Sequence, residues 1–201
     1  MHSRGTHTAP FVISPIPNDP SPADIAGYRD LRLAALKSDP ACFGSTYSRE
    51  AAFDDATWRA RITGSGRRTV VAHEPRSAED SQDEGAGRLV GSATVIAARA
   101  VPGVPLPAGA ERTTAYFVFG MWVRPEWRQH GVGRMLLTHA LDWVAQDAGS
   151  GEGPGRGCAV VWLEVAAGNG EAKRLYERAQ FEYAGVGEHG GVWMSRLENA
   201  S

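Results

Sequence analysis

The 201-residue sequence has little that would assign it to a membrane, a metal site or an oxidising compartment. It has only two cysteines, Cys42 and Cys158, which favours free thiols over a disulfide framework. No apolar run approaches the ~18 residues of a membrane span, and the polar segment 1–10 lacks the apolar stretch of a signal peptide. The six histidines show no zinc-ligand spacing. We therefore expect a cytoplasmic protein that binds neither a membrane nor a metal.

The sequence also lacks a large excess of charge of either sign, because the formal net charge is only −2. The chain therefore has no overall basic field for nucleic acid, and an anionic ligand would need a local basic cluster. The composition, 42% hydrophobic and 22% charged, is that of an ordinary globular protein. We expect a flexible tail over residues 1–10 and a single domain over residues 11–198.

Apolar periodicity and turn residues predict the element order β-α-α-β-β-β-α-β-α-β-β. The expected strands cover about 11–16, 69–72, 88–96, 115–123, 159–165, 181–183 and 192–195. The expected helices cover about 21–38, 49–62, 131–148 and 169–180. This mixed order predicts an α+β or mixed α/β fold with a largely antiparallel sheet. In the helix over 131–148, His139 falls on the apolar face and is expected in the core.

The clearest chemical motif follows the strand that ends at Val123. A short basic loop there opens a helix through Gly131 and Gly133. Helix N-termini carry unpaired N–H groups and partial positive charge, and glycines let a phosphate approach the backbone. Three arginines belong to the same turn: Arg124, Arg128 and Arg134. The two glycines alone fit a tight loop before a packed helix equally well.

Two other nucleotide motifs are excluded by the same segment. The dinucleotide fingerprint requires a third glycine where this chain has Leu136, and a phosphate-binding P-loop requires Gly-Lys-Ser/Thr. An NAD(P)-linked oxidoreductase therefore fits the segment poorly.

Residues 123–137 read Val-x-Pro-x-x-Arg-x-x-Gly-x-Gly-Arg-x-Leu-Leu, which resembles the signature of the GNAT superfamily of N-acetyltransferases. Residues 163–181, with Asn169, Leu175-Tyr176 and Phe181, are similar to the second conserved stretch of that family. Gln180 stands where the family usually has glycine. Residues 31–47 resemble a common bacterial branch. The resemblance implies an α/β (α+β) fold with a mixed, mostly antiparallel sheet of six to seven strands and about four helices.

The resemblance further implies acetyl-CoA as cosubstrate, no metal, and transfer of acetyl to a primary amine by direct attack in a ternary complex. The backbone of Met121 and Val123 would pair with the pantetheine arm, and amides of residues 129–134 would hold the pyrophosphate. Asn169 would contact the pantetheine, cap the last helix, or do both. The expected cofactor-binding residues are Met121, Trp122, Val123, Arg128, Gln129, His130, Gly131, Val132, Gly133, Arg134 and Asn169.

Tyr176 matches the family tyrosine that protonates the departing thiolate, although its helical spacing also fits a core residue. Glu164 is the candidate general base, because its side chain faces away from Leu163 and Val165 on the same strand. A backbone amide near an expected bulge at residues 120–122 would stabilise the oxyanion. Other candidates for the base are Glu50, His73 and Glu111.

The acceptor is expected to be a small molecule in preference to a protein, and the chain a monomer or homodimer. The acidic residues between Glu74 and Glu84 hint at a cationic acceptor, and the segment 100–110 is either a wall of the substrate site or an insertion. The alternative function is a non-catalytic acyl-CoA-binding sensor or scaffold module of the same fold.

Overall fold

The computed structural model describes residues 11–75, 87–103, 105–150, 158–187 and 190–199, which form one seven-stranded sheet. The strands are β1 Val12–Pro15, β2 Arg67–His73, β3 Leu89–Ala97, β4 Ala115–Val123, β5 Cys158–Val165, β6 Glu182–Val186 and β7 Val192–Asn199, in the order β1-β2-β3-β4-β5-β7-β6. Every neighbouring pair is antiparallel except β4 and β5. The mostly antiparallel mixed sheet is confirmed. The tail over 1–10 and most of the acidic segment lie outside the described residues.

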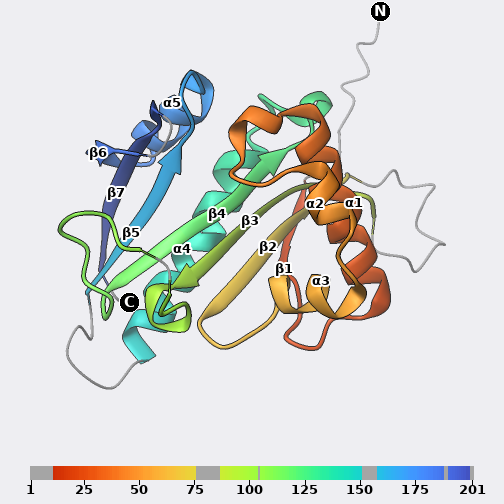
Figure 1. Ribbon diagram of the computed structural model, residues 1–201, viewed down its shortest axis with the longest axis horizontal. Coiled ribbons are helices and arrows are strands. Elements are labelled where there is room, and N and C mark those ends of the chain that lie inside the picture. The colour runs from red at the N-terminus through yellow and green to blue at the C-terminus, as the bar shows by residue number, and fades with distance from the viewer. Residues whose placement is uncertain (1–10, 76–86, 104, 151–157, 188–189, 200–201) are drawn as a thin grey trace, which may run out of the picture.

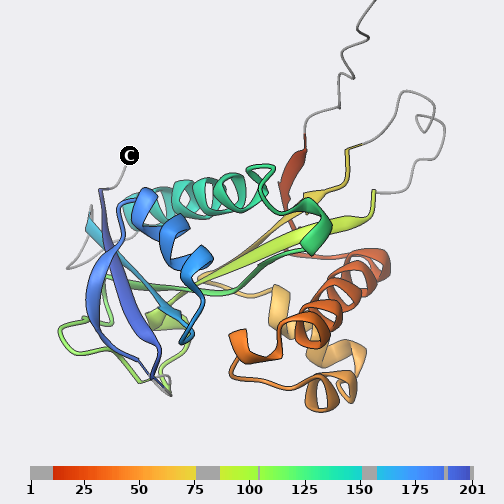
Figure 2. The ribbon, with the colours of Figure 1, turned by 90° about the horizontal axis from the view of Figure 1, so that it is seen from above.

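Helices cover both faces of the sheet (Figures 1 and 2). They are α1 Pro22–Ser38, α2 Tyr47–Ala51, α3 Asp55–Ile62, α4 Val132–Ser150 and α5 Gly170–Arg178, with short 3-10 turns η1 Pro40–Cys42, η2 Ala98–Ala100 and η3 Pro125–Trp127. Figure 2 shows α1, α2 and α3 on one side of the sheet and α4 on the other. We call these the α1 face and the α4 face. None of the described helices is long and apolar enough to cross a membrane.

Local signals account for the helix starts. Ser21 caps α1 by accepting the amide of Asp24 at 3.2 Å, while Asp24 accepts the amide of Ser21 at 2.9 Å. The prediction of one helix over 49–62 was wrong, because the helix is interrupted at residues 52–54. Asp54 starts a new helix there by accepting the amide of Thr57 at 2.8 Å.

The buried side of α4 does not include His139, which was predicted to lie on the apolar face. Its buried residues include Val132, Leu136, Ala140 and Val144, which are spaced four apart and form one stripe along the helix. His139 is exposed, and the expectation that it lies in the core was wrong. The helix turns its largest continuous apolar stripe toward the sheet, and His139 lies outside that stripe.

The core has separate parts on the two faces. The largest cluster joins α4 and Tyr176 of α5 to the α4 face of the sheet. On the α1 face, Trp58 and its neighbours pack under α1 and α3. Further along that face, Phe117 and Trp162 pack with Trp193 and with Leu106 and Ala110 of the segment 100–110, without a covering helix in their cluster.

Candidate active site

The sheet opens between its two parallel strands. β4 and β5 pair only from Ala115–Val160 to Phe117–Trp162, although both strands continue well beyond these positions. β4 stays paired with β3, and β5 stays paired with β7 to its last residue, Val165. The two inner edges therefore separate, as Figure 1 shows. Unpaired strand edges present backbone N–H and C=O groups that a ligand can bind.

A β-bulge lies on β4 beside this opening, as expected. Thr94 pairs with Phe119 and Ser92 pairs with Trp122, so Gly120 and Met121 together face the single residue between them on β3. Gly120 has a φ of 59°, which glycine adopts without steric cost. The extra residue turns the strand, so that Met121 packs with the α4 cluster and Trp122 with α1.

The loop after β4 presents backbone amides at the start of α4. Gln129 and Gly131 have φ values of 65° and 82°, and this double left-handed turn leads into the helix. The first helical bond runs from the Met135 amide to the Gly131 carbonyl at 3.1 Å. The preceding amides in the first turn have no partner within the helix, which is the arrangement that binds anions.

The two glycines of the motif have different roles. A Cβ on Gly131 would have no atom within 4 Å, so the surface there is open to a ligand. A Cβ on Gly133 would lie 3.2 Å from Cδ2 of Leu175 and 3.6 Å from Cε of Met121. Gly133 therefore allows the first turn of α4 to pack closely against α5 and β4, whereas Gly131 keeps the loop accessible.

Asp39, at the end of α1, organises the base of this loop. Its Oδ2 accepts hydrogen bonds from Nη2 of Arg128 and from Nε1 of Trp122, each at 2.7 Å. Nε of Arg128 also donates to the carbonyl of Val123 at 3.1 Å. Burial raises the pKa of Asp39, but the bonds from Trp122 and Arg128 outweigh it and hold the pKa below 3.8. Sequence reasoning missed Asp39, since it is 89 positions from Arg128.

The remaining groups of the loop differ in their accessibility. Nε of Arg124 donates to the carbonyl of Leu89 at 2.9 Å, on the β3 side of the loop. Arg134 and His130 are exposed, and Nδ1 of His130 lies 2.7 Å from the Arg128 carbonyl. Of the three arginines expected around a phosphate, Arg124 and Arg128 are bonded within the protein, and Arg134 is exposed.

Asn169 lies at the start of α5, across the opening from the loop. Its Oδ1 accepts the amide of Ala172 at 3.1 Å, so it is the N-cap of α5. Its Nδ2 lies 3.5 Å from the sulfur of Cys42 in η1. Burial, followed by the charge of Asp39, raises the pKa of the Cys42 thiol. Cys42 is therefore a neutral thiol beside Asn169.

Tyr176 lies on the inner side of α5. Its hydroxyl donates to Sδ of Met121 at 3.4 Å, and its ring packs edge-on against Phe181 with centroids 5.8 Å apart. Burial raises the pKa of the phenol, so the hydroxyl keeps its proton at neutral pH. Tyr176 is thus both a core residue and a proton-bearing group beside the bulge.

Glu164 is exposed on the opposite side of β5 from Tyr176. Its neighbours Leu163 and Val165 belong to the same cluster as Tyr176, so the alternation of the strand turns Glu164 to the α1 face. Its carboxylate lies against Gly187, where an added Cβ would clash with it. The two candidate catalytic residues therefore lie on different faces.

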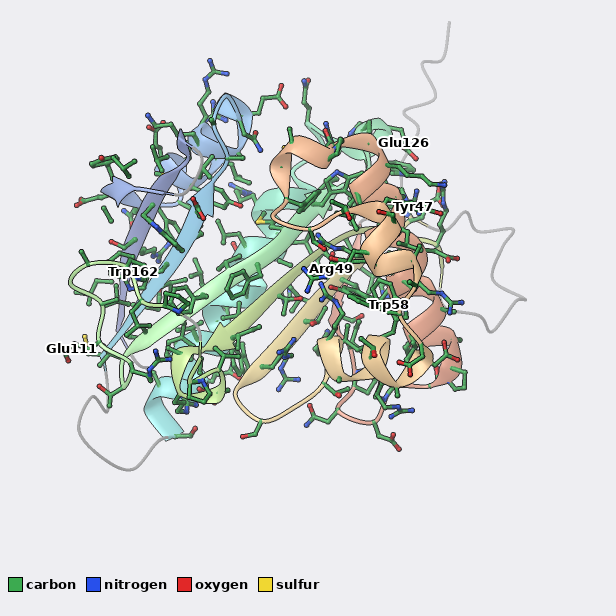
Figure 3. All side chains as sticks on the ribbon, in the orientation of Figure 1. Tyr47, Arg49, Trp58, Glu111, Glu126 and Trp162 are labelled. Atoms are coloured by element: carbon green, nitrogen blue, oxygen red, sulfur yellow. The ribbon has the colours of Figure 1, made fainter. Side chains whose placement is uncertain are left out.

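The other candidate bases are not at the opening. Glu50 is fully buried and bonded to two arginines. His73 lies at the β1 edge, with Nε2 2.9 Å from Oγ of Ser14. Figure 3 shows Glu111 at the far end of the sheet, near the start of β4, away from the loop after Val123.

Comparisons with known proteins agree with this architecture. Residues 34–181 match the acetyltransferase (GNAT) family. Over 69 residues the chain is 36% identical to the ribosomal protein bS18-alanine N-acetyltransferase of Escherichia coli strain K12, a stretch covering 34% of this chain and 40% of that relative. The chain thus spans well under two thirds of that curated relative.

Solved structures share the fold. A GNAT-family acetyltransferase from Streptococcus pneumoniae aligns with a TM-score of 0.63 at 16% identity, over 94% of this chain and 99% of that one. A putative acetyltransferase from Salmonella typhimurium, solved with its cofactor acetyl-CoA, gives 0.63 at 15% identity, over 96% and 95%. Because the family match covers residues 34–181, well over half of the sequence, the chain belongs to the acetyltransferase (GNAT) family.

Proposed function

We propose that the chain transfers an acetyl group from acetyl-CoA to a primary amine by direct attack in a ternary complex. The observation that carries the proposal is the unpaired inner edge of β4 beside a helix N-terminus with free amides. A long ligand with a peptide-like arm and a pyrophosphate requires these two features side by side. The acetyl-CoA in the Salmonella typhimurium neighbour supports the choice of ligand.

The loop residues fit the pyrophosphate. Amides of Gln129, His130, Gly131, Val132, Gly133 and Arg134 would donate to it, and the open surface at Gly131 admits it. The exposed guanidinium of Arg134 would add a charge-assisted bond. Arg128 would act indirectly, because its bonds to Asp39 and Val123 hold the loop in place.

The edge of β4 fits the amide-bearing arm of the cofactor. The amide of Arg124 donates to the Val90 carbonyl of β3 at 2.8 Å. Since backbone groups alternate along an antiparallel strand, the amide of Val123 points to the opening instead. Met121, Trp122 and Val123 would bind the arm through this backbone edge, and Asn169 would close the site from α5.

The chemistry then needs an acid, an oxyanion donor and a base. Acetyl-CoA supplies a thioester whose thiolate leaves when the amine attacks. Tyr176 would donate its proton to that thiolate, a backbone amide of the bulge at Gly120 and Met121 would stabilise the oxyanion, and Glu164 would accept the proton of the amine. Direct attack requires no enzyme nucleophile, so Cys42 has no covalent role.

A thiol-release assay with a panel of primary amines tests the proposal, together with titrations of CoA and NAD. We expect release that depends on both acetyl-CoA and an amine, and binding of CoA but not of NAD. Tight CoA binding without turnover on any amine would instead support the alternative, a non-catalytic acyl-CoA sensor. Binding of NAD in place of CoA would contradict both.

Four further properties belong to the same proposal. Residues 11–198 act as one domain, which the single sheet from β1 to β7 supports. A reducing compartment such as the cytoplasm fits the two free cysteines. The acceptor is a small molecule in preference to a protein, although the named relative acts on a ribosomal protein. A monomer or a homodimer is expected, which light scattering would decide.

A further inference from the structure

A buried ion-pair cluster lies beneath α1 and α2 on the α1 face. Arg32 donates to both carboxylate oxygens of Glu50, from Nε at 2.9 Å and from Nη2 at 2.8 Å. Nη2 of Arg61 reaches the same carboxylate at 3.3 Å. The side chains of Arg32 and Glu50 are 9% and 0% exposed. Burial raises the pKa of Glu50, but the bonds and charges of the arginines outweigh it and keep the pKa below 4.5.

The cluster carries one surplus positive charge, since two guanidinium groups share a single carboxylate. Two of its buried donors, Nη1 of Arg32 and Nε of Arg61, have no hydrogen-bond partner among the described residues. Such orphaned charged donors are costly, because they are removed from water without compensation. Arg49, which precedes Glu50 on α2, is exposed and forms no ion pair among the described residues. The surplus positive charge of this cluster therefore favours the binding of an anion.

The free donor of Arg32 lies beside the bulge of β4, where the proposed acetyl transfer would take place. Nη1 lies 3.9 Å from the position of a Cβ on Gly120, the residue that starts the bulge. Phe43 covers one side of the guanidinium, with its ring centroid 4.5 Å from Cζ. Figure 3 shows Arg49 reaching from α2 toward the middle of the same face.

Resting on the proposed acetyl transfer, we infer that the acceptor is an amino acid, whose carboxylate pairs with Arg32 while its α-amine meets the thioester at the bulge. The carboxylate of the amino acid would supply the anion that the cluster lacks. Because an α-amine lies close to its own carboxylate, one small molecule would reach both Arg32 and the bulge. Polyamines would bring a second positive charge to an already positive site. Phe119 of β4, 41% exposed on the same face, offers an apolar surface to the rest of the acceptor.

Matched acceptors test this in the wild-type protein. Each amino acid is compared with its carboxamide and with a dipeptide that begins with the same residue, by thiol release at saturating acetyl-CoA. We expect kcat/KM for the free amino acid to exceed that for the carboxamide by about 10- to 100-fold, the effect of a hydrogen bond between charged groups. Equal rates would overturn the inference while leaving acetyl transfer intact, and faster dipeptide turnover would point to a protein N-terminus.

Substitutions then locate the effect. Arg32→Lys keeps a positive charge for Glu50 but loses the free Nη1 donor of the guanidinium. It should therefore raise KM for the amino acid about tenfold and leave the rate with the carboxamide unchanged. Arg61→Lys, at a side chain 36% exposed, provides the second variant if Arg32→Lys does not fold. Arg29→Lys is the matched control, because Arg29 lies on α1 with Arg32 but pairs at the surface with Asp55 of α3. Equal losses on both acceptors in both cluster variants would show that the cluster only stabilises the fold.

CoA titration separates this test from that of the proposed function. Wild type and all three variants should bind CoA equally, because none of the hydrogen bonds described for the cluster reaches the loop at the start of α4. If no acceptor of any kind supports thiol release although CoA binds, the proposed transferase activity has failed. A preference for carboxamides over amino acids with normal CoA binding would refute only the inference about the acceptor.

Discussion

Tyr176→Phe removes one hydroxyl from the inner side of α5. Among the described residues that hydroxyl forms a hydrogen bond only with Sδ of Met121, at 3.4 Å. A thioether is a weak hydrogen-bond acceptor, so little is lost in the folded state and an imperfectly paired polar group leaves the interior. We therefore expect the free energy of unfolding to change by less than about 1 kcal/mol, in either direction.

The expected effect on turnover is much larger. A positioned general acid contributes roughly 10²- to 10⁴-fold to the rate, so kcat should fall by that factor while the Kd for CoA stays within about twofold. Burial raises the pKa of the phenol, so the protonated form persists as the pH rises well beyond neutrality. The wild-type rate should therefore show no alkaline decline caused by Tyr176 across the ordinary assay range.

Tyr116→Phe provides the matched control. The hydroxyl of Tyr116 donates to Oδ2 of Asp147 at 2.7 Å and accepts from Arg99 at 3.0 Å. Its loss should lower the free energy of unfolding by about 1–3 kcal/mol and leave turnover intact. Thiol-release kinetics, CoA titration and thermal denaturation measure both variants. If Tyr176→Phe turns over as fast as wild type, Tyr176 serves packing alone and the reasoning fails.

Three other substitutions probe the loop and the ion pairs. Gly131→Val should weaken CoA binding at least tenfold by titration, because a φ of 82° costs a branched residue about 1–2 kcal/mol and the side chain would cover the amides; unchanged affinity would exclude the loop as the pyrophosphate site. Glu50→Ala should lower the free energy of unfolding by about 3–5 kcal/mol in denaturant melts, since it leaves Arg32 buried and uncompensated. Because the arginines lower the pKa of Glu50 from its ordinary value of 4.5, its stabilisation of the wild type should be present above that ordinary value and lost as the pH falls through the lowered pKa. A pH-independent stability down to about pH 3 would contradict this. Asp39→Asn should cost only about 1 kcal/mol, because the Asp39–Arg128 pair is partly exposed; a loss as large as that of Glu50→Ala would show otherwise.

Elements whose signals lie within a few residues were predicted from the sequence. The strand over 115–123 was predicted with the bounds that β4 has, because prolines and glycines precede it and the loop of the motif follows it. The bulge at Gly120 and the cap at Asn169 were also predicted. The single helix over 49–62 failed, because the capping carboxylate of Asp54 outweighs the continued apolar spacing.

What the sequence by itself determined is therefore local: the strand and helix that carry the motif, and the glycines that open its loop. Only the tertiary structure decided where β4 and β5 separate, that Glu164 and Tyr176 lie on opposite faces, and that Asp39 holds Arg128. The same holds for the pairing of Arg32 with Glu50. Capping and turn preferences act between neighbouring residues, whereas ion pairs and strand separation depend on which distant segments the packed core brings together.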